Sequence, residues 1–168
     1  MPMSAPGRVF WPVASLVLLA DYSTKRAIED ALAAGGSKPI IDHLVQFTLA
    51  YNQGAVFATR LGPYQRWLMI GLVVAVLVVL ARSYRQITQR GLFGTVGLAL
   101  IAGGAAGNLL DRIISARGVV DFIDVGIGDS RFYLFNVADG GVSVGAAILA
   151  YVFWQDARAK RARQGLAS

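Results

Sequence analysis

The chain has 168 residues, of which 55% are hydrophobic and only 15% are charged. A typical soluble domain has about 25% charged residues, so a water-soluble fold of this length could not cover so much apolar surface. The absence of cysteine excludes disulfides, thiolate metal sites and a cysteine nucleophile, and the single histidine, His43, excludes an HExxH zinc site. The net charge of +6 comes from bases that gather beside apolar segments, which indicates membrane lipids as partners and not nucleic acid.

Four apolar segments predict one integral membrane domain that covers residues 1–168. We expect the spans at about residues 9–27, 65–82, 91–110 and 136–155. The first segment could instead be a cleaved signal peptide, because it has a basic residue and a short apolar core. No small-x-small cleavage site precedes Asp21 and three more spans follow, so a retained helix is favoured.

The distribution of basic residues predicts which ends of the spans face the cytoplasm. The short loop after the second span carries Arg82, Arg85 and Arg90 without any acid. The segment after the fourth span carries four bases that are opposed only by Asp156. We therefore expect both termini to be cytoplasmic and nine of the ten acids to lie at or near the outer side.

The outer segment after the first span has a different pattern. Apolar and more polar side chains alternate from Val45 to Asn52, which predicts a half-buried strand. An Asn-Gln-Gly turn follows, and residues 55–57 could return as a second strand. The expected fold is a membrane all-α bundle of four transmembrane helices with a small extracytoplasmic β hairpin, or cradle, within about residues 38–60.

Asp139 is the only charged residue between Phe132 and Gln155. An ionisable residue inside a span costs roughly 2.5–3.5 kcal/mol on insertion scales and suggests function by default. If the helix starts near Asn136, Asp139 lies about 4–5 Å below its outer end. Asp139 could simply stabilise the helix N-terminus through the macrodipole, although Asn136 could already provide the cap.

Two ion pairs of a structural kind are expected at the ends of the first and third spans. Asp111 and Arg112 are adjacent at the end of the third span, which favours a helix-end pair. Asp21 and Lys25 lie one turn apart at the end of the first span, which favours a helix-stabilising pair. We assign Asp21, Lys25 and Asp111 mainly to architecture.

Asp121 lies in an apolar context that is unusual for a solvated carboxylate, whereas Asp124 and Asp129 lie among glycines and are read as ordinary loop acids. Spacing alone does not decide which acid meets Asp139. Two carboxylates that are close together at a partly dry interface cannot both ionise, so one pKa rises and the pair shares a proton. The ionised member can then take a proton from water while the protonated member polarises a scissile carbonyl, without a metal or cofactor.

Five short blocks stand in order along most of the chain. They are residues 21–25 (DYSTK), 52–57 (NQGAVF), 103–112 (GGAAGNLLDR), 119–122 (VVDF) and 135–139 (FNVAD). Each block alone is a weak signal, but five in order within a four-span protein are highly specific. Together they resemble the bacterial lipoprotein signal peptidases, the signal peptidase II family.

The resemblance implies an intramembrane aspartic endopeptidase of the bacterial cytoplasmic (inner) membrane, with Asp121 and Asp139 as its catalytic dyad. Its substrate would be a prolipoprotein whose cysteine already carries diacylglycerol, cut on the N-terminal side of that cysteine. The hairpin would correspond to the family's cradle over the substrate, and we expect a monomer. Five positions would line the substrate site: Asn52, Gly104, Asn108, Arg112 and Asn136.

Two departures from the family pattern are visible. Tyr22 stands where the family usually has glutamine, which is expected to alter packing more than chemistry. Gly140 and Gly141 follow the second aspartate, where bulkier residues are common. Each glycine weakens a helix by roughly 1 kcal/mol relative to alanine, so the start of the fourth span is expected to be looser than usual.

Three other functions fit the sequence less well. A proton-coupled transporter would usually place its carboxylates near the membrane midplane and show repeated halves. A Ser-Lys peptidase could use Ser23 with Lys25, but residues two apart on a helix do not face each other. A non-enzymatic scaffold would leave the five blocks unexplained.

Overall fold

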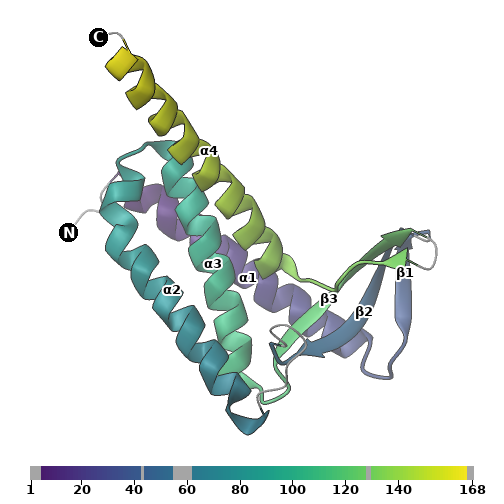
Figure 1. Ribbon diagram of the computed structural model, residues 1–168. Coiled ribbons are helices and arrows are strands. Elements are labelled where there is room, and N and C mark those ends of the chain that lie inside the picture. Colours follow the sequence, from purple (N-terminus) through teal and green to yellow (C-terminus); the bar gives the residue numbers. More distant parts are fainter. Residues whose placement is uncertain (1–4, 43, 55–61, 128–129, 166–168) are drawn as a thin grey trace.

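The computed structural model describes residues 5–42, 44–54, 62–127 and 130–165, and it shows long helices with a small antiparallel sheet at one end (Figure 1). The helices are α1 (Gly7–Ala31), α2 (Gln65–Thr88), α3 (Leu92–Ile114) and α4 (Val137–Gly165). The strands are β1 (Ser37–Ile41), β2 (Val45–Asn52), β3 (Val119–Ile127) and β4 (Ser130–Arg131), and a short 3-10 helix, η1 (Gly62–Tyr64), precedes α2.

Three helices in the described part of the chain are long and apolar enough to cross a membrane: α2, α3 and the Val137–Gln164 part of α4. The first helix, α1, has 25 residues, which is long enough for a crossing. Its charged residues, among them Asp21 and Lys25, lower its apolar content. The mostly helical membrane fold with a small sheet is therefore present, and the expectation of four spans is met for three helices.

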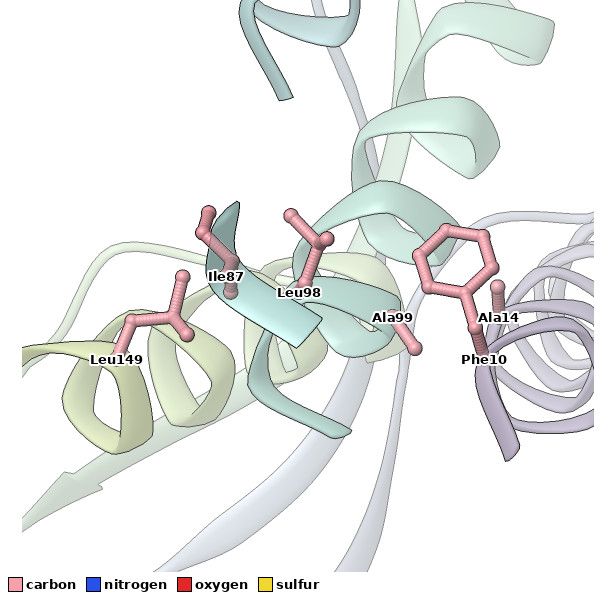
Figure 2. Close-up of a cluster of buried hydrophobic side chains, with 6 residues drawn as sticks. All are labelled: Phe10, Ala14, Ile87, Leu98, Ala99 and Leu149. Carbon is pink, nitrogen blue, oxygen red and sulfur yellow. The ribbon is translucent and has the colours of Figure 1, made fainter. Parts of the chain in front are cut away.

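The third helix, α3, is the centre of the bundle, because α1, α2 and α4 all pack against it. Small residues allow this close packing. A Cβ atom at Gly103 would lie 2.5 Å from the carbonyl oxygen of Ala14 on α1, and at Gly104 it would overlap that of Ala138 on α4. Figure 2 shows the apolar cluster that joins the helices at the end away from the sheet. Its buried members are Phe10, Ala14, Ile87, Leu98, Ala99 and Leu149.

The sheet has the strand order β1-β2-β3-β4, and each neighbouring pair is antiparallel. The predicted strand from Val45 to Asn52 is confirmed as β2, whose partners are β1 and β3. The proposed return strand at residues 55–57 lies outside the described residues. β3 was not predicted, because residues 119–122 are all buried and so lack the alternation of a one-sided strand.

The sheet packs against the C-terminal end of α1, and this contact fixes where β3 lies. Ile28 of α1 and Leu32, the residue that caps its C-terminus, form a buried cluster with Val120 and Phe122 of β3. Asp121 lies between Val120 and Phe122 in β3, so the cluster places it next to the helix ends. The sheet therefore serves as a platform that carries Asp121 to the bundle.

Candidate active site

Asp121 and Asp139 come from separate elements and are joined through one side chain, Asn136. Asp121 belongs to β3 and is 4% exposed, whereas Asp139 lies in the first turn of α4. The Asn136 Nδ2 donates to Asp121 Oδ1 at 2.7 Å, and the Asn136 Oδ1 accepts from the backbone N–H of Asp139 at 3.0 Å. The Asn136 N–H in turn donates to Asp139 Oδ2 at 3.2 Å. The two acids that the sequence singled out are thus within reach of one amide.

The bond between Asn136 and Asp139 is a reciprocal helix cap, in which each side chain accepts the backbone N–H of the other. Asp139 therefore stabilises the start of α4, as the simpler interpretation of the sequence held. The cap uses Oδ2 of Asp139, and Oδ1 accepts a further bond from Asn108 Nδ2 at 2.8 Å. Capping and a place in the acid pair are therefore compatible.

Asparagine amides supply the side-chain donors to both acids. Asn52 Nδ2 donates to Asp121 Oδ2 at 2.9 Å, so both oxygens of Asp121 accept an asparagine N–H. The direction of the Asn52 amide is set by Gly54, whose N–H can only donate and which bonds Asn52 Oδ1 at 2.8 Å. The Asp139 N–H fixes Asn136 in the same way. Each amide therefore turns its NH2 group toward a carboxylate.

Burial raises the pKa of Asp121 to about 6. This pKa is the net value: the nearby charge of Asp139 also acts to raise it, while the hydrogen bonds from Asn52 and Asn136 and the charge of Lys25 act to lower it. A carboxyl that keeps its proton up to this pH, beside a second carboxyl with two N–H donors, is the arrangement that acid–base catalysis by two acids requires.

A buried ion cluster supports the acid pair from the side of α1. The Lys25 Nζ lies 2.7 Å from Asp21 Oδ2, so the predicted pair between these residues is confirmed. The same ammonium lies 2.9 Å from Asp111 Oδ2 and donates to Asn108 Oδ1 at 2.9 Å. The other Asp21 oxygen accepts the backbone N–H of Ala138 at 2.9 Å, next to Asp139. The cluster thus ties α1 to α3 and to the start of α4.

The expected pairing of Asp111 with Arg112 is wrong. Asp111 is instead bonded by Lys25, by Arg26 at 3.0 Å and by the backbone N–H of Val120 at 3.1 Å. Adjacent residues of a helix point in different directions, so Asp111 turns into the bundle while Arg112 does not follow it. Arg112 donates from Nη1 to the carbonyl oxygen of Asn108 at 3.0 Å.

Arg112 lines a cleft of about 260 Å³ between the end of α3 and the start of α2. Other residues along it include Gln53, Gln65, Arg66, Trp67 and Gly118. Gly104 lies elsewhere, buried between α3 and α4, where the Ala138 carbonyl leaves no space for a side chain. Its place in a substrate site stays a prediction, whereas its place in helix packing is plain.

Reading Asp124 as an ordinary loop acid is wrong, because it lies in β3 and is only 5% exposed. It accepts hydrogen bonds from Gln46 Nε2 at 2.6 Å and from Arg131 Nε at 3.0 Å. Burial acts to raise its pKa, but the bonds from Arg131 and Gln46 outweigh burial and hold the pKa below its usual value. Three positions apart on a strand, Asp121 and Asp124 point to opposite faces of the sheet.

No group of three or more His, Cys, Asp or Glu side chains within the described residues could hold a metal ion. Two residues of these types, His43 and Asp129, lie outside that part of the chain. The side chains around Asn136 supply the carboxyl groups of Asp121 and Asp139 and the amide of Asn108, which Lys25 also bonds.

The chain is similar in sequence and in structure to known proteins of bacterial membranes. The model of the family described as signal peptidase (SPase) II matches residues 13–155. A lipoprotein signal peptidase of Ectopseudomonas mendocina is 36% identical over 98% of this chain and 100% of the relative, and one of Hydrogenovibrio crunogenus is 36% identical over 82% and 80%. A solved bacterial membrane enzyme superposes with a TM-score of 0.76 at 30% identity, covering 86% of this chain and 91% of that one. The chain therefore belongs to the signal peptidase II family and is a protease of the membrane.

Proposed function

We propose that this protein is an intramembrane aspartic endopeptidase of the bacterial inner membrane. It removes the signal peptide from diacylglyceryl-modified prolipoproteins by cutting on the N-terminal side of the lipidated cysteine. The observation that carries the proposal is the joining of Asp121 and Asp139 through Asn136. The names of the relatives, lipoprotein signal peptidases, support the substrate class. All of the reacting groups come from one chain, so a monomer without a cofactor is sufficient.

In the proposed reaction, Asp139 is the base and Asp121 is the acid. Asp139 takes a proton from water as the water oxygen bonds to the scissile carbonyl carbon, and Asp121 gives its proton to the carbonyl oxygen. The resulting tetrahedral intermediate returns that proton to Asp121, and the C–N bond breaks as the leaving amine takes the proton held by Asp139. Both acids then regain their starting states.

The surroundings of the two acids support this division of roles. The charged form of Asp139 accepts N–H groups from Asn108 and Asn136 and lies at the positive end of the α4 dipole. Asp121 is more deeply buried and its pKa is about 6, which favours the protonated form for this member of the pair. The hydrogen bonds thus favour a pair that holds one proton.

The proposed substrate contacts are made by Asn52, Asn108, Arg112 and Asn136, with Gly104 allowing α4 to lie close by. A peptide that unfolds at the membrane surface needs partners for its backbone carbonyls, because lipid supplies none. Arg112 is suited to this task, since a guanidinium has five N–H donors and a cleft of about 260 Å³ lies beside it.

We propose that α1 is the fourth crossing helix. The side chains of Trp11, Leu16 and Leu19 are exposed, up to 68% for Leu16, as expected for a face in contact with lipid. The charges of Asp21 and Lys25 are buried against α3 and so do not meet lipid. The start of α1 and the end of α4 lie at the end of the bundle opposite the sheet (Figure 1), as an even number of crossings requires. The arginine-rich loop before α3 lies at that end too, since Arg90 pairs with Asp156, and it is proposed to be cytoplasmic.

This topology is tested with single cysteines, because the chain has none of its own. Lys38→Cys on β1 is expected to react with a membrane-impermeant maleimide in intact spheroplasts. Ala5→Cys and Ala162→Cys are expected to react only after the membrane is opened. Equal labelling of Ala5→Cys and Lys38→Cys in intact spheroplasts would show that α1 does not cross.

The substrate class is tested with the purified protein in detergent and one prolipoprotein in two forms, with and without the diacylglyceryl group. We expect kcat/KM to be at least about 100-fold higher for the lipidated form, because the acyl chains hold the scissile bond near the acids. Mass spectrometry of the product checks the position of the cut. Equal rates for the two forms would remove lipid recognition from the proposal, and cleavage of neither form would remove the peptidase.

A further inference from the structure

Lys25 is completely buried, with 0% of its side chain exposed, and the proposed reaction does not use it. An ammonium group has three N–H donors and no acceptor. Its Nζ forms ion pairs with Asp21 at 2.7 Å and Asp111 at 2.9 Å, and it donates a hydrogen bond to the Asn108 amide oxygen at 2.9 Å. Arg26 also bonds Asp111, and its other nitrogen pairs with Glu29, which in turn pairs with Arg117.

The bond to Asn108 is the unexpected one, because the two carboxylates would already neutralise the ammonium. Since Lys25 can only donate, the oxygen of the Asn108 amide must face it. The NH2 group then points the opposite way and donates to Asp139 Oδ1 at 2.8 Å. A reversed amide would place its NH2 group against the ammonium of Lys25 and its oxygen against the carboxylate of Asp139.

We propose that Lys25 is a positioning residue for the peptidase reaction, and that it acts by holding the Asn108 amide with its NH2 group toward Asp139. The bond from Asn136 Nδ2 to Asn108 Oδ1, at 3.1 Å, adds a second donor to the same oxygen. A fixed amide favours the ionised form of Asp139, which is the base of the proposed mechanism. This inference rests on the proposed function and adds a residue to its machinery that does not touch the substrate.

Other charged groups also act on Asp139, and the test has to separate them from Lys25. Asp121 approaches it from β3, and Arg112 attracts it from α3. Lys25 is connected to it from α1 through Asn108. Loss of Lys25 alone would also leave two buried carboxylates short of a partner, which threatens folding.

The experiment therefore compares two charge-matched double variants. Asp21→Asn with Lys25→Met removes one acid and one base and cuts the bond to Asn108. Asp21→Asn with Arg26→Met also removes one acid and one base and leaves that bond in place, while Glu29, the other partner of Arg26, keeps its bonds to Arg117 and Tyr51. In both variants, the amide oxygen introduced by Asp21→Asn can still accept the Ala138 N–H. Melting temperature in detergent reports folding, and kcat is measured on the lipidated prolipoprotein from pH 4 to pH 8.

We call the two double variants the Lys25 pair and the Arg26 pair. We expect the Lys25 pair to lower kcat by about ten- to hundredfold, the range for one hydrogen bond to a charged group. Its acidic limb should move to higher pH, because the charged form of Asp139 has lost its fixed donor. The Arg26 pair should stay within about threefold of the unchanged protein, with no shift of that limb. Adding Asn108→Ala to the Lys25 pair should lower kcat little more than Asn108→Ala alone lowers it, because both changes remove the same interaction.

Equal losses in the two pairs without a shift of the acidic limb would overturn the inference and leave Lys25 with architecture alone. The inference would also be overturned if the losses of kcat from the Lys25 pair and from Asn108→Ala added up in the combined variant. If the Lys25 pair does not fold, Asn108→Ala by itself must move the acidic limb, and an unchanged profile would be decisive against the inference. These outcomes all presuppose cleavage by the unchanged protein, whose absence would instead overturn the proposed function and this inference with it.

Discussion

Changing either Asp121→Asn or Asp139→Asn is expected to lower kcat for a lipidated prolipoprotein by at least about 1,000-fold, within the range for loss of an acid–base group. An asparagine has the shape of an aspartate, but it cannot take a proton from water or give one to the carbonyl oxygen. The NH2 group of the new asparagine would also face another donor. At position 121 this donor is Asn52 or Asn136, and at position 139 it is Asn108 or the backbone N–H of Asn136. We therefore expect no residual rate through local rearrangement. Cleavage in detergent, with insertion and melting temperature measured in parallel, checks the result.

The matched control is Asp124→Asn, which changes the neighbouring acid of the same strand. Asp124 faces the other side of the sheet and bonds Gln46 and Arg131. This variant is expected to keep its activity within a few-fold and to lose about 1.5–3 kcal/mol of stability with the charged hydrogen bond. Activity of Asp121→Asn or Asp139→Asn at the level of this control would remove that residue from the mechanism.

The pH dependence of the unchanged protein gives the same pair a second test. The acid Asp121 must hold its proton, and its pKa in the free protein is about 6. Below this pH the carboxyl is protonated and above it the carboxyl ionises, so kcat/KM is expected to fall as the pH rises through about 6. A kcat/KM that is constant from pH 5 to pH 8 would contradict the role of Asp121 as the acid.

The limits of the helices show what hydropathy can predict. The second span was expected to end at residue 82, yet α2 continues to Thr88, and α4 continues ten residues beyond the expected 155. Hydropathy marks where lipid begins and ends, whereas a helix continues into water as long as its residues favour helix. The positions of the helices were therefore predicted well, and the C-terminal ends of α2 and α4 were not.

The members of the candidate site were predictable, because they lie in short ordered blocks. Their connections were not. The pair of Asp21 with Lys25 follows from a spacing of four, but the bond from Lys25 to Asn108 joins residues 83 positions apart. The direction of each amide depends on such distant donors. Likewise, Asp124 was misread because nothing local shows that β3 pairs with β2 and brings Gln46 beside it.

Gly104→Ala is expected to destabilise the protein by about 1–3 kcal/mol, the usual cost of overpacking a close contact. The new Cβ would overlap the Ala138 carbonyl oxygen and lie 2.9 Å from Val142 Cγ2, so α4 would have to move away from α3. That movement would carry Asp139 away from Asn108. Both the melting temperature and kcat should therefore fall, and circular dichroism in detergent with the cleavage assay measures them.

Gly140→Ala is the matched control, because a Cβ at Gly140 meets no atom within 4 Å. Alanine favours helix by about 1 kcal/mol over glycine, so this variant should melt at a higher temperature and tighten the start of α4. The same substitution one helix apart thus has opposite expected effects, set only by what faces the added methyl group. If Gly104→Ala were as stable as Gly140→Ala yet inactive, the close approach of α3 and α4 would not be required for folding, and Gly104 would act at the substrate instead.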